Sequence, residues 1–143
     1  MSSFKVHILA ADESFYEGEC ESLIVPTSNG QYGILAHHAN TISAIVPGEM
    51  LYRLPGGQQQ KAAVSSGLVK VENGEVLVLV DSAERPEEID ANRAKRAADA
   101  AKEALLQKKS FREYHEAQAT LARAIARLRV KGDANQKIHN NKG

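Results

Sequence analysis

Two arginines separated by about one helical turn, Arg123 and Arg127, form the clearest candidate for ligand chemistry in this sequence. At this spacing two guanidinium groups share one face of a helix, where their fixed N–H donors suit a polyphosphate. The alternative is a solvated charged face, which Glu116 on an earlier turn supports. Asp90 is equally ambiguous, because an aspartate before a helical segment is either an N-cap or a hydrogen-bond acceptor for a ligand.

Adjacent histidines, His37 and His38, suggest a metal site at first sight. Neighbouring residues on a strand point to opposite faces, so the two rings cannot reach one ion without help. We therefore expect a turn or interface role for this pair and no metal. The sequence also contains glycines that we interpret as turn or bulge residues, because a phosphate loop needs an adjacent helix start; they are Gly30, Gly33, Gly67 and Gly74.

Motifs of common enzyme classes are absent from the sequence. It contains no phosphate-binding P-loop, no C-x-x-C pair and no H-E-x-x-H zinc motif. Ser65-Ser66-Gly67 does not fit the G-x-S-x-G pattern of a nucleophile turn. We therefore expect a protein that is not an enzyme, that requires no cofactor, and that acts through its surfaces.

The charge is distributed unevenly although its sum is zero. Residues 1–86 contain 5 basic and 10 acidic side chains, whereas residues 87–143 contain 13 basic and 8 acidic ones. This opposition favours docking of the two halves on each other, or an acidic partner for the second half. The single cysteine, Cys20, excludes a disulfide within the chain and favours a reducing compartment. Without a signal peptide or a long apolar run, we expect a soluble protein.

The first 86 residues have the pattern of a small β domain. Short segments that alternate between apolar and polar residues, such as Phe4–Leu9, are separated by the turn dipeptides Asn29-Gly30, Pro47-Gly48 and Asn73-Gly74. Many short strands at a spacing of roughly 8–12 residues predict an antiparallel sandwich or flattened barrel over residues 1–86.

Residues 87–132 predict two helices joined by a short break. The first helix begins with Pro86 in its first turn or with Asp90 as its cap. The second begins at Ser110, which forms a capping box with Glu113, and is expected to end at Gly132. Alanine-rich stripes predict that the helices pack antiparallel, through residues 94, 97, 98, 101, 104 and 105 of the first and residues 114, 117, 121, 124, 125 and 128 of the second. We expect residues 133–143 to be a disordered tail.

Four colinear segments resemble the epsilon subunit of bacterial F-type ATP synthases. They are Gly30–Ala39, Ser65–Val71, Ile89–Ala94 and Leu121–Val130. The resemblance covers about Phe4 to Val130 and implies a ten-stranded β-sandwich followed by a two-helix hairpin. It also implies a non-catalytic place in the central stalk of the rotor, with the gamma subunit, the ring of c subunits and the catalytic alpha/beta head as partners.

The resemblance further implies a regulatory hairpin. It packs on the sandwich in one state and extends into the catalytic head in another, where it inhibits ATP hydrolysis. In some members regulatory ATP binds the packed hairpin, and the matching positions here are Glu84, Asp90, Arg93, Arg123 and Arg127. A further arginine of nucleotide-binding members is replaced by Ala100, which implies that ATP binding is either weak or lost. The partner-interface positions are Gln31, Tyr32, His38 and Arg129.

Our interpretation is therefore a regulatory stalk subunit on the cytoplasmic face of a bacterial cell membrane, in contact with the membrane only through its complex. Two alternatives remain open. One is a freestanding β-sandwich binding module whose helical hairpin dimerises. The other is a nucleic-acid binder that uses the basic second helix, which the few aromatic residues and the acidic sandwich disfavour. We expect no nucleic-acid partner.

Overall fold

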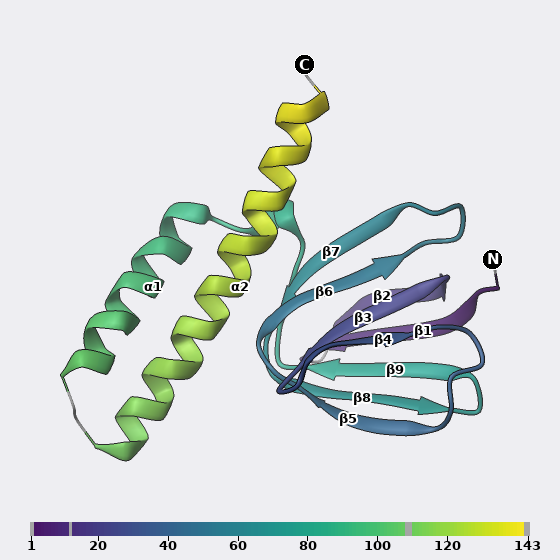
Figure 1. Cartoon of the computed structure of the whole chain (residues 1–143), viewed down its shortest axis with the longest axis horizontal. Coiled ribbons are helices and arrows are strands. Elements are labelled where there is room, and N and C mark those ends of the chain that lie inside the picture. The colour runs from purple at the N-terminus through teal and green to yellow at the C-terminus, as the bar shows by residue number, and fades with distance from the viewer. Residues whose placement is uncertain (1, 12, 108–109, 142–143) are drawn as a thin grey trace.

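The computed structural model describes residues 2–11, 13–107 and 110–141, with side chains described as far as Gly132. Within these residues, ten strands form two five-stranded sheets that face each other, and two helices follow (Figure 1). The predicted fold class, a β-sandwich followed by a two-helix hairpin, is confirmed.

The first sheet has the strand order β2-β1-β9-β8-β5. Its strands are β1 (Phe4–Ala10), β2 (Glu13–Cys20), β5 (Thr41–Ile45), β8 (Gly67–Glu72) and β9 (Glu75–Val80). Its neighbouring strands are antiparallel except β1 and β9, which run parallel. Asn73 and Gly74 join β8 to β9 with φ angles of 53° and 80°, as a two-residue hairpin turn requires.

The second sheet has the order β10-β7-β6-β3-β4. Its strands are β3 (Ser22–Thr27), β4 (Gly30–Ile34), β6 (Gly48–Arg53), β7 (Gln59–Val64) and β10 (Ala83–Glu84). Gly30 follows the β3–β4 turn with a φ of 108°. Gly67, expected at a turn or bulge, instead begins β8, where a Cβ would overlap the carbonyl oxygen of Leu79 on β9.

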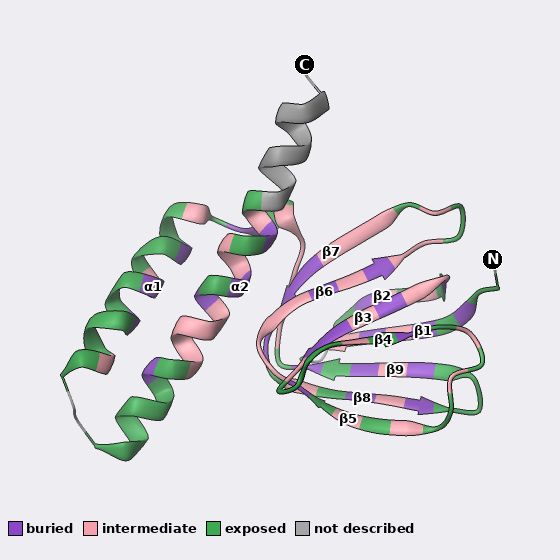
Figure 2. Ribbon diagram, in the orientation of Figure 1, coloured by how far each residue is buried: buried purple, intermediate pink, exposed green. Residues whose placement is uncertain are grey.

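Alternate side chains of the strands fill the space between the sheets (Figure 2). On β1 the buried residues are Phe4, Val6 and Ile8, which is the face expected from the sequence. Cys20 is fully buried in this core, and burial raises the pKa of its thiol to about 11. Desolvation likewise raises the pKa of the Tyr16 hydroxyl to about 12.

Both expected start signals are used at the beginning of the hairpin. Pro86 opens a short 3₁₀ turn, η1 (Pro86–Glu88), and Asp90 then caps α1 (Ala91–Leu106). In α2 (Phe111–Asn141) the Glu113 amide donates to the Ser110 hydroxyl oxygen over 3.3 Å. The expected helix end at Gly132 is wrong, because the helix backbone continues to Asn141, into the segment where we expected a disordered tail. A glycine within a helix costs only about 1 kcal/mol and does not terminate it unaided.

The second helix lies between the first helix and the sandwich (Figure 1). The two helices pack on each other, and their buried residues are small. These are Ala94, Ala98 and Ala101 of α1 and Ala117 and Ala124 of α2. Other members of the expected stripes are not buried, since Ala104 is exposed and Tyr114 and Ile125 are 43% and 41% exposed. A second side of α2 packs instead on β6 and β7 of the sandwich.

Candidate functional site

A cavity of about 310 Å³ lies where α1, α2 and the junction after β10 meet. It is lined by Glu84, Glu88, Asp90, Arg93, Ala94, Ala97 and Arg127. The structure thus brings together four of the five expected ATP-binding residues, Glu84, Asp90, Arg93 and Arg127. The volume is at the lower end of the roughly 300–1,000 Å³ typical of small-molecule sites.

The first turns of α1 form one wall of this cavity. Asp90, Arg93, Ala94 and Ala97 are spaced at three or four residues, so they share one face of the helix. The Asp90 carboxylate accepts a hydrogen bond of 3.1 Å from the Arg93 backbone amide. Asp90 therefore acts as a helix cap in this structure, with its carboxylate at the edge of the cavity.

Arg127 approaches the cavity from α2. Its Nε donates to Oε1 of Glu84 over 2.7 Å, and the two side chains are 32% and 28% exposed. This ion pair joins the second helix to β10. A phosphate group that binds Arg127 through the same nitrogen must first displace the Glu84 carboxylate.

Arg123, the fifth expected residue, is not among the side chains that line the cavity. Its guanidinium donates to the Thr120 hydroxyl on its own helix over 3.2 Å. Ala100, where nucleotide-binding members have an arginine, is exposed on α1. The lining carries three carboxylates and two guanidiniums, so its formal charge does not favour a polyanion.

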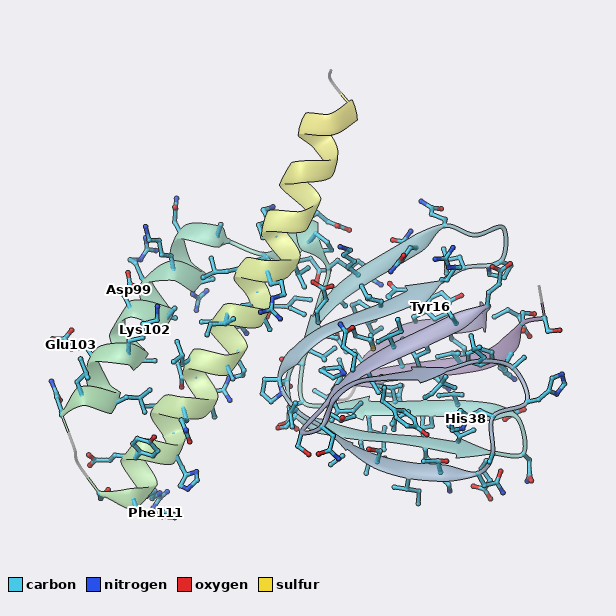
Figure 3. All side chains as sticks on the ribbon, in the orientation of Figure 1. Tyr16, His38, Asp99, Lys102, Glu103 and Phe111 are labelled. Atoms are coloured by element: carbon cyan, nitrogen blue, oxygen red, sulfur yellow. The ribbon has the colours of Figure 1, made fainter. Side chains whose placement is uncertain are left out.

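The expected partner-interface residues lie in two separate places. His38 lies at the end of the sandwich remote from the hairpin (Figure 3), and its Nε2 is 2.9 Å from the Tyr32 hydroxyl. Its Nδ1 lies 2.8 Å from the Ala39 carbonyl oxygen and must donate to it, so in the neutral ring Nε2 accepts from Tyr32. Gln31 precedes Tyr32 on β4 and is exposed, whereas Arg129 is exposed on α2.

The turn at His37 completes this end of the sandwich. His37 lies in a turn and has a φ of 65°, which confirms the expected turn. Leu35, just before the turn, is 58% exposed, and sequence reasoning did not select it. No cluster of three or more metal-ligating acidic, histidine or cysteine side chains occurs among the described residues.

A larger cavity of about 540 Å³ lies on the outer face of the first sheet. Its lining carries basic and acidic side chains, with Lys70 Nζ 2.6 Å from Glu72 and His7 Nε2 3.7 Å from Glu17. This mixture of signs selects no ligand class. Within the described part of the chain, neither helix has the length and apolar character needed to span a membrane.

Sequence reasoning missed several residues around the cavity between the hairpin and the junction. Ala94 and Ala97 could have been found from their helical spacing to Asp90, and Glu88 from its place in the turn that Pro86 opens. Lys131 does not line the cavity. Its contact with the Pro86 carbonyl oxygen (Nζ to O, 3.1 Å) could not be predicted, because it forms only when the helix docks.

The fold and this site define a two-domain protein, in which a helical hairpin docks on a β-sandwich and encloses a small charged cavity. Residues 3–86 match the family model described as "ATP synthase, Delta/Epsilon chain, beta-sandwich domain". Residues 87–132 match "ATP synthase, Delta/Epsilon chain, long alpha-helix domain". The chain belongs to the ATP synthase delta/epsilon family, and the predicted resemblance is confirmed.

Curated relatives cover nearly the whole chain. The ATP synthase epsilon chain of Ruminiclostridium cellulolyticum is 42% identical over 128 residues, which are 90% of this chain and 95% of the relative. The epsilon chain of Ruminococcus albus is 40% identical over 138 residues, 96% of this chain and all of the relative. These relatives are named as chains of a complex, in agreement with the predicted non-catalytic subunit.

A solved structure shares the fold. A chain of the Euglena gracilis mitochondrial ATP synthase, in a structure of OSCP, F1 and the c-ring, superimposes with a TM-score of 0.76. The two chains are 22% identical, and the match covers 84% of this chain and 76% of that one. At 22% identity, this similarity is evidence for a shared fold alone.

Proposed function

We propose that this chain is a non-catalytic rotor subunit in the central stalk of an F-type ATP synthase, at the cytoplasmic face of a bacterial membrane. Its partners are the gamma subunit, the c-ring and the catalytic alpha/beta head, and it meets the membrane only through that complex. Support comes from family membership across both domains and from relatives named as epsilon chains.

We further propose that the hairpin regulates ATP hydrolysis by leaving the sandwich and extending into the head. The observation that carries this proposal is the small contact that docks α2. The contact consists of one apolar cluster and two polar contacts at its side, which Arg127 and Lys131 make. The cluster contains Ala63, Ile89, Ala126 and Val130. A buried alanine methyl group contributes only about 0.8 kcal/mol and a fully buried valine about 1.5–3 kcal/mol, so α2 gains only a few kcal/mol from this cluster, a free energy that binding of a ligand or partner can offset.

The second part of the proposal is that regulatory ATP binds in the cavity between the hairpin and the junction and stabilises the docked state. A ligand at 100 times its dissociation constant stabilises the state that it binds by about 2.7 kcal/mol, which is comparable with such a docking contact. In this proposal Arg127 exchanges Glu84 for the phosphates, Arg93 and Asp90 contribute from α1, and Arg123 moves toward the cavity. With Glu84 released and Arg123 added, the lining has three guanidiniums and two carboxylates, so its formal charge then suits a polyanion.

The regulatory function is tested with the complex reconstituted around three forms of this chain. We expect a chain truncated after Glu88 to give faster ATP hydrolysis than the full chain, because the inhibitory helices are missing. A chain truncated after Gly132, which keeps the docked part of the hairpin, is the matched control and should inhibit like the full chain. Equal hydrolysis with all three forms contradicts the proposed regulation.

The nucleotide site is tested by thermal unfolding of the isolated chain with and without ATP. We expect ATP to raise the melting temperature of the wild type, and the combined substitution of Arg123→Ala and Arg127→Ala to abolish that increase. Arg112→Ala is the control, because Arg112 is 89% exposed at the far end of the hairpin. The same ATP-dependent increase in the double variant refutes the nucleotide site.

The freestanding, dimerising module is the alternative function. The buried alanines of both helices already face each other within one chain, so they are not available to a second copy. Co-purification with a large membrane-attached ATPase supports the stalk subunit, and a free dimer in the same lysate supports the module.

A further inference from the structure

The junction between the two domains is bound to the sandwich by contacts in which α2 takes no part. The Ser82 amide donates to the Ser65 hydroxyl oxygen over 2.7 Å, and the Ser65 amide donates to the Ser82 carbonyl oxygen over 3.1 Å. Ser65 is only 4% exposed. The next two residues form β10, which pairs with β7. This part of the junction is therefore continuous with the second sheet.

Arg85 extends the attachment beyond β10. Its Nη2 donates to the Phe15 carbonyl oxygen on β2 over 2.7 Å, and the guanidinium carbon lies 4.2 Å from the centre of the Phe15 ring. A cation above an aromatic face is attracted by the ring. Arg85 thus connects the junction to the first sheet, 70 residues earlier in the chain.

Arg85 and Glu88 also close the turn between them. The Arg85 amide donates to Glu88 Oε2 over 3.0 Å, the Glu88 amide donates to the Arg85 carbonyl oxygen over 3.0 Å, and the two side chains form an ion pair of 3.4 Å. All of these bonds lie within residues 85–88. None of them therefore involves a residue of α1 or α2.

The polar contacts from α2 to the junction are of a different kind. Among the described residues they are two side-chain contacts, Arg127 to Glu84 and Lys131 to the Pro86 carbonyl oxygen. Long, partly exposed side chains can release such contacts without disturbing the backbone. Between η1 and α1 stand Ile89 and Asp90, with extended φ, ψ pairs of −91°, 126° and −90°, 105°.

We propose that Arg85 is a fixed anchor of the junction and that the hairpin pivots at Ile89–Asp90. Residues 82–88 stay on the sandwich whether the hairpin is docked or extended. The contacts that open are the polar ones of Arg127 and Lys131 and the packing of Ala126 and Val130. Arg85 is a positioning residue, since it sets where the moving helices start. This inference rests on the proposed function, because it locates the hinge of the movement proposed there.

Hydrogen exchange of the full isolated chain tests the anchor directly. Val130→Asp undocks α2, because it places an unpaired carboxylate at a fully buried position, and small-angle X-ray scattering verifies the undocking as a larger radius of gyration. We expect the amides of Ser65, Ser82 and Glu88 to keep their exchange rates within about threefold of wild type, because local opening of the junction is independent of α2. Loss of their protection in Val130→Asp, with the rest of the sandwich still protected, overturns the inference.

A second substitution tests the role of Arg85. In the Val130→Asp background, Arg85→Met keeps an unbranched side chain of similar length but removes the charge and its donors. We expect the Glu88 amide to exchange at least about tenfold faster in this variant, because its turn is no longer held. Arg112→Met is the matched control and should leave that rate unchanged. An unchanged Glu88 rate in Arg85→Met also overturns the inference.

These outcomes separate the anchor from the proposed regulation. If the chain truncated after Glu88 leaves hydrolysis unchanged, regulation fails regardless of the exchange data. If truncation accelerates hydrolysis but Val130→Asp releases residues 82–88, the hairpin moves and the pivot lies earlier in the junction.

Discussion

Val130 is the side chain on which docking of the hairpin depends most. It is fully buried in the cluster with Ala63, Ile89 and Ala126, where it is the largest residue that α2 contributes. Val130→Ala removes two methyl groups, or about 1.6 kcal/mol at about 0.8 kcal/mol per buried group. The residual cavity raises the cost to about 2 kcal/mol. Since about 1.4 kcal/mol is a factor of ten, the ratio of docked to undocked chains should fall roughly 25-fold.

Thiol reactivity can measure this ratio. Ala63 on β7 is 5% exposed beneath α2, so an Ala63→Cys reporter reacts with a thiol reagent mainly in undocked molecules. The native Cys20 does not interfere, because it is buried and its thiol has a pKa of about 11. We expect the reporter to react roughly 25-fold faster in Val130→Ala than in the reporter protein alone.

Val78→Ala supplies the matched control. Val78 is also 0% exposed but lies in the sandwich core, away from the hairpin. It should lower the melting temperature of the sandwich and leave the reporter rate nearly unchanged. Equal reporter rates in the Val130→Ala and parent proteins would show that this cluster does not hold the hairpin, and our account of docking would be refuted.

Three further predictions concern the sandwich and the start of α1. Gly67→Ala should lower the free energy of unfolding, measured in urea, by about 3 kcal/mol, because the added Cβ overlaps the backbone of β9. Gly33→Ala is the control and should cost less than about 1 kcal/mol, because the space around its Cβ is open. Equal losses in the two variants would contradict the close approach of Gly67 to β9. The Cys20 pKa is raised from 9.0 to about 11, so its contribution to stability is complete below pH 9 and is lost as the pH rises through 11. Unfolding at a series of pH values should therefore show a smaller loss in Cys20→Ala over this range, and identical losses contradict the assignment. Asp90→Ala should destabilise α1 by about 1 kcal/mol and reduce helical circular dichroism, whereas Asp90→Asn should retain the cap; a similar loss in both variants indicates a role for the charge.

The sandwich was largely predictable because its signals are local. Alternation in residues 4–9 identified the buried face of β1, and the Asn73-Gly74 dipeptide identified a turn that the structure contains. Alternation determines which face a side chain occupies but does not determine the neighbouring strand. The parallel pairing of β1 with β9 joins segments about 70 residues apart and has no local signal.

The second helix was predicted as an element but not in its packing. One apolar stripe was expected, yet α2 has two buried sides, with Ala117 and Ala124 toward α1 and Ala126 and Val130 toward the sandwich. Alanine is small enough to suit either side, so its periodicity cannot distinguish them. The candidate site was predictable in part, since the spacing of Asp90 and Arg93 places both at the start of one helix. That Arg127 meets Glu84 depends on the docked arrangement of the domains.

The most direct test of hairpin movement is to lock α2 on the sandwich within the reconstituted complex. Ala63→Cys and Ala126→Cys place one cysteine on each side of the docking cluster, and mass spectrometry verifies the disulfide. With the disulfide formed, we predict ATP hydrolysis as fast as with the chain truncated after Glu88, and with it reduced, the slower hydrolysis of the wild type. Equal inhibition in the oxidised and reduced states would contradict regulation by an undocking hairpin.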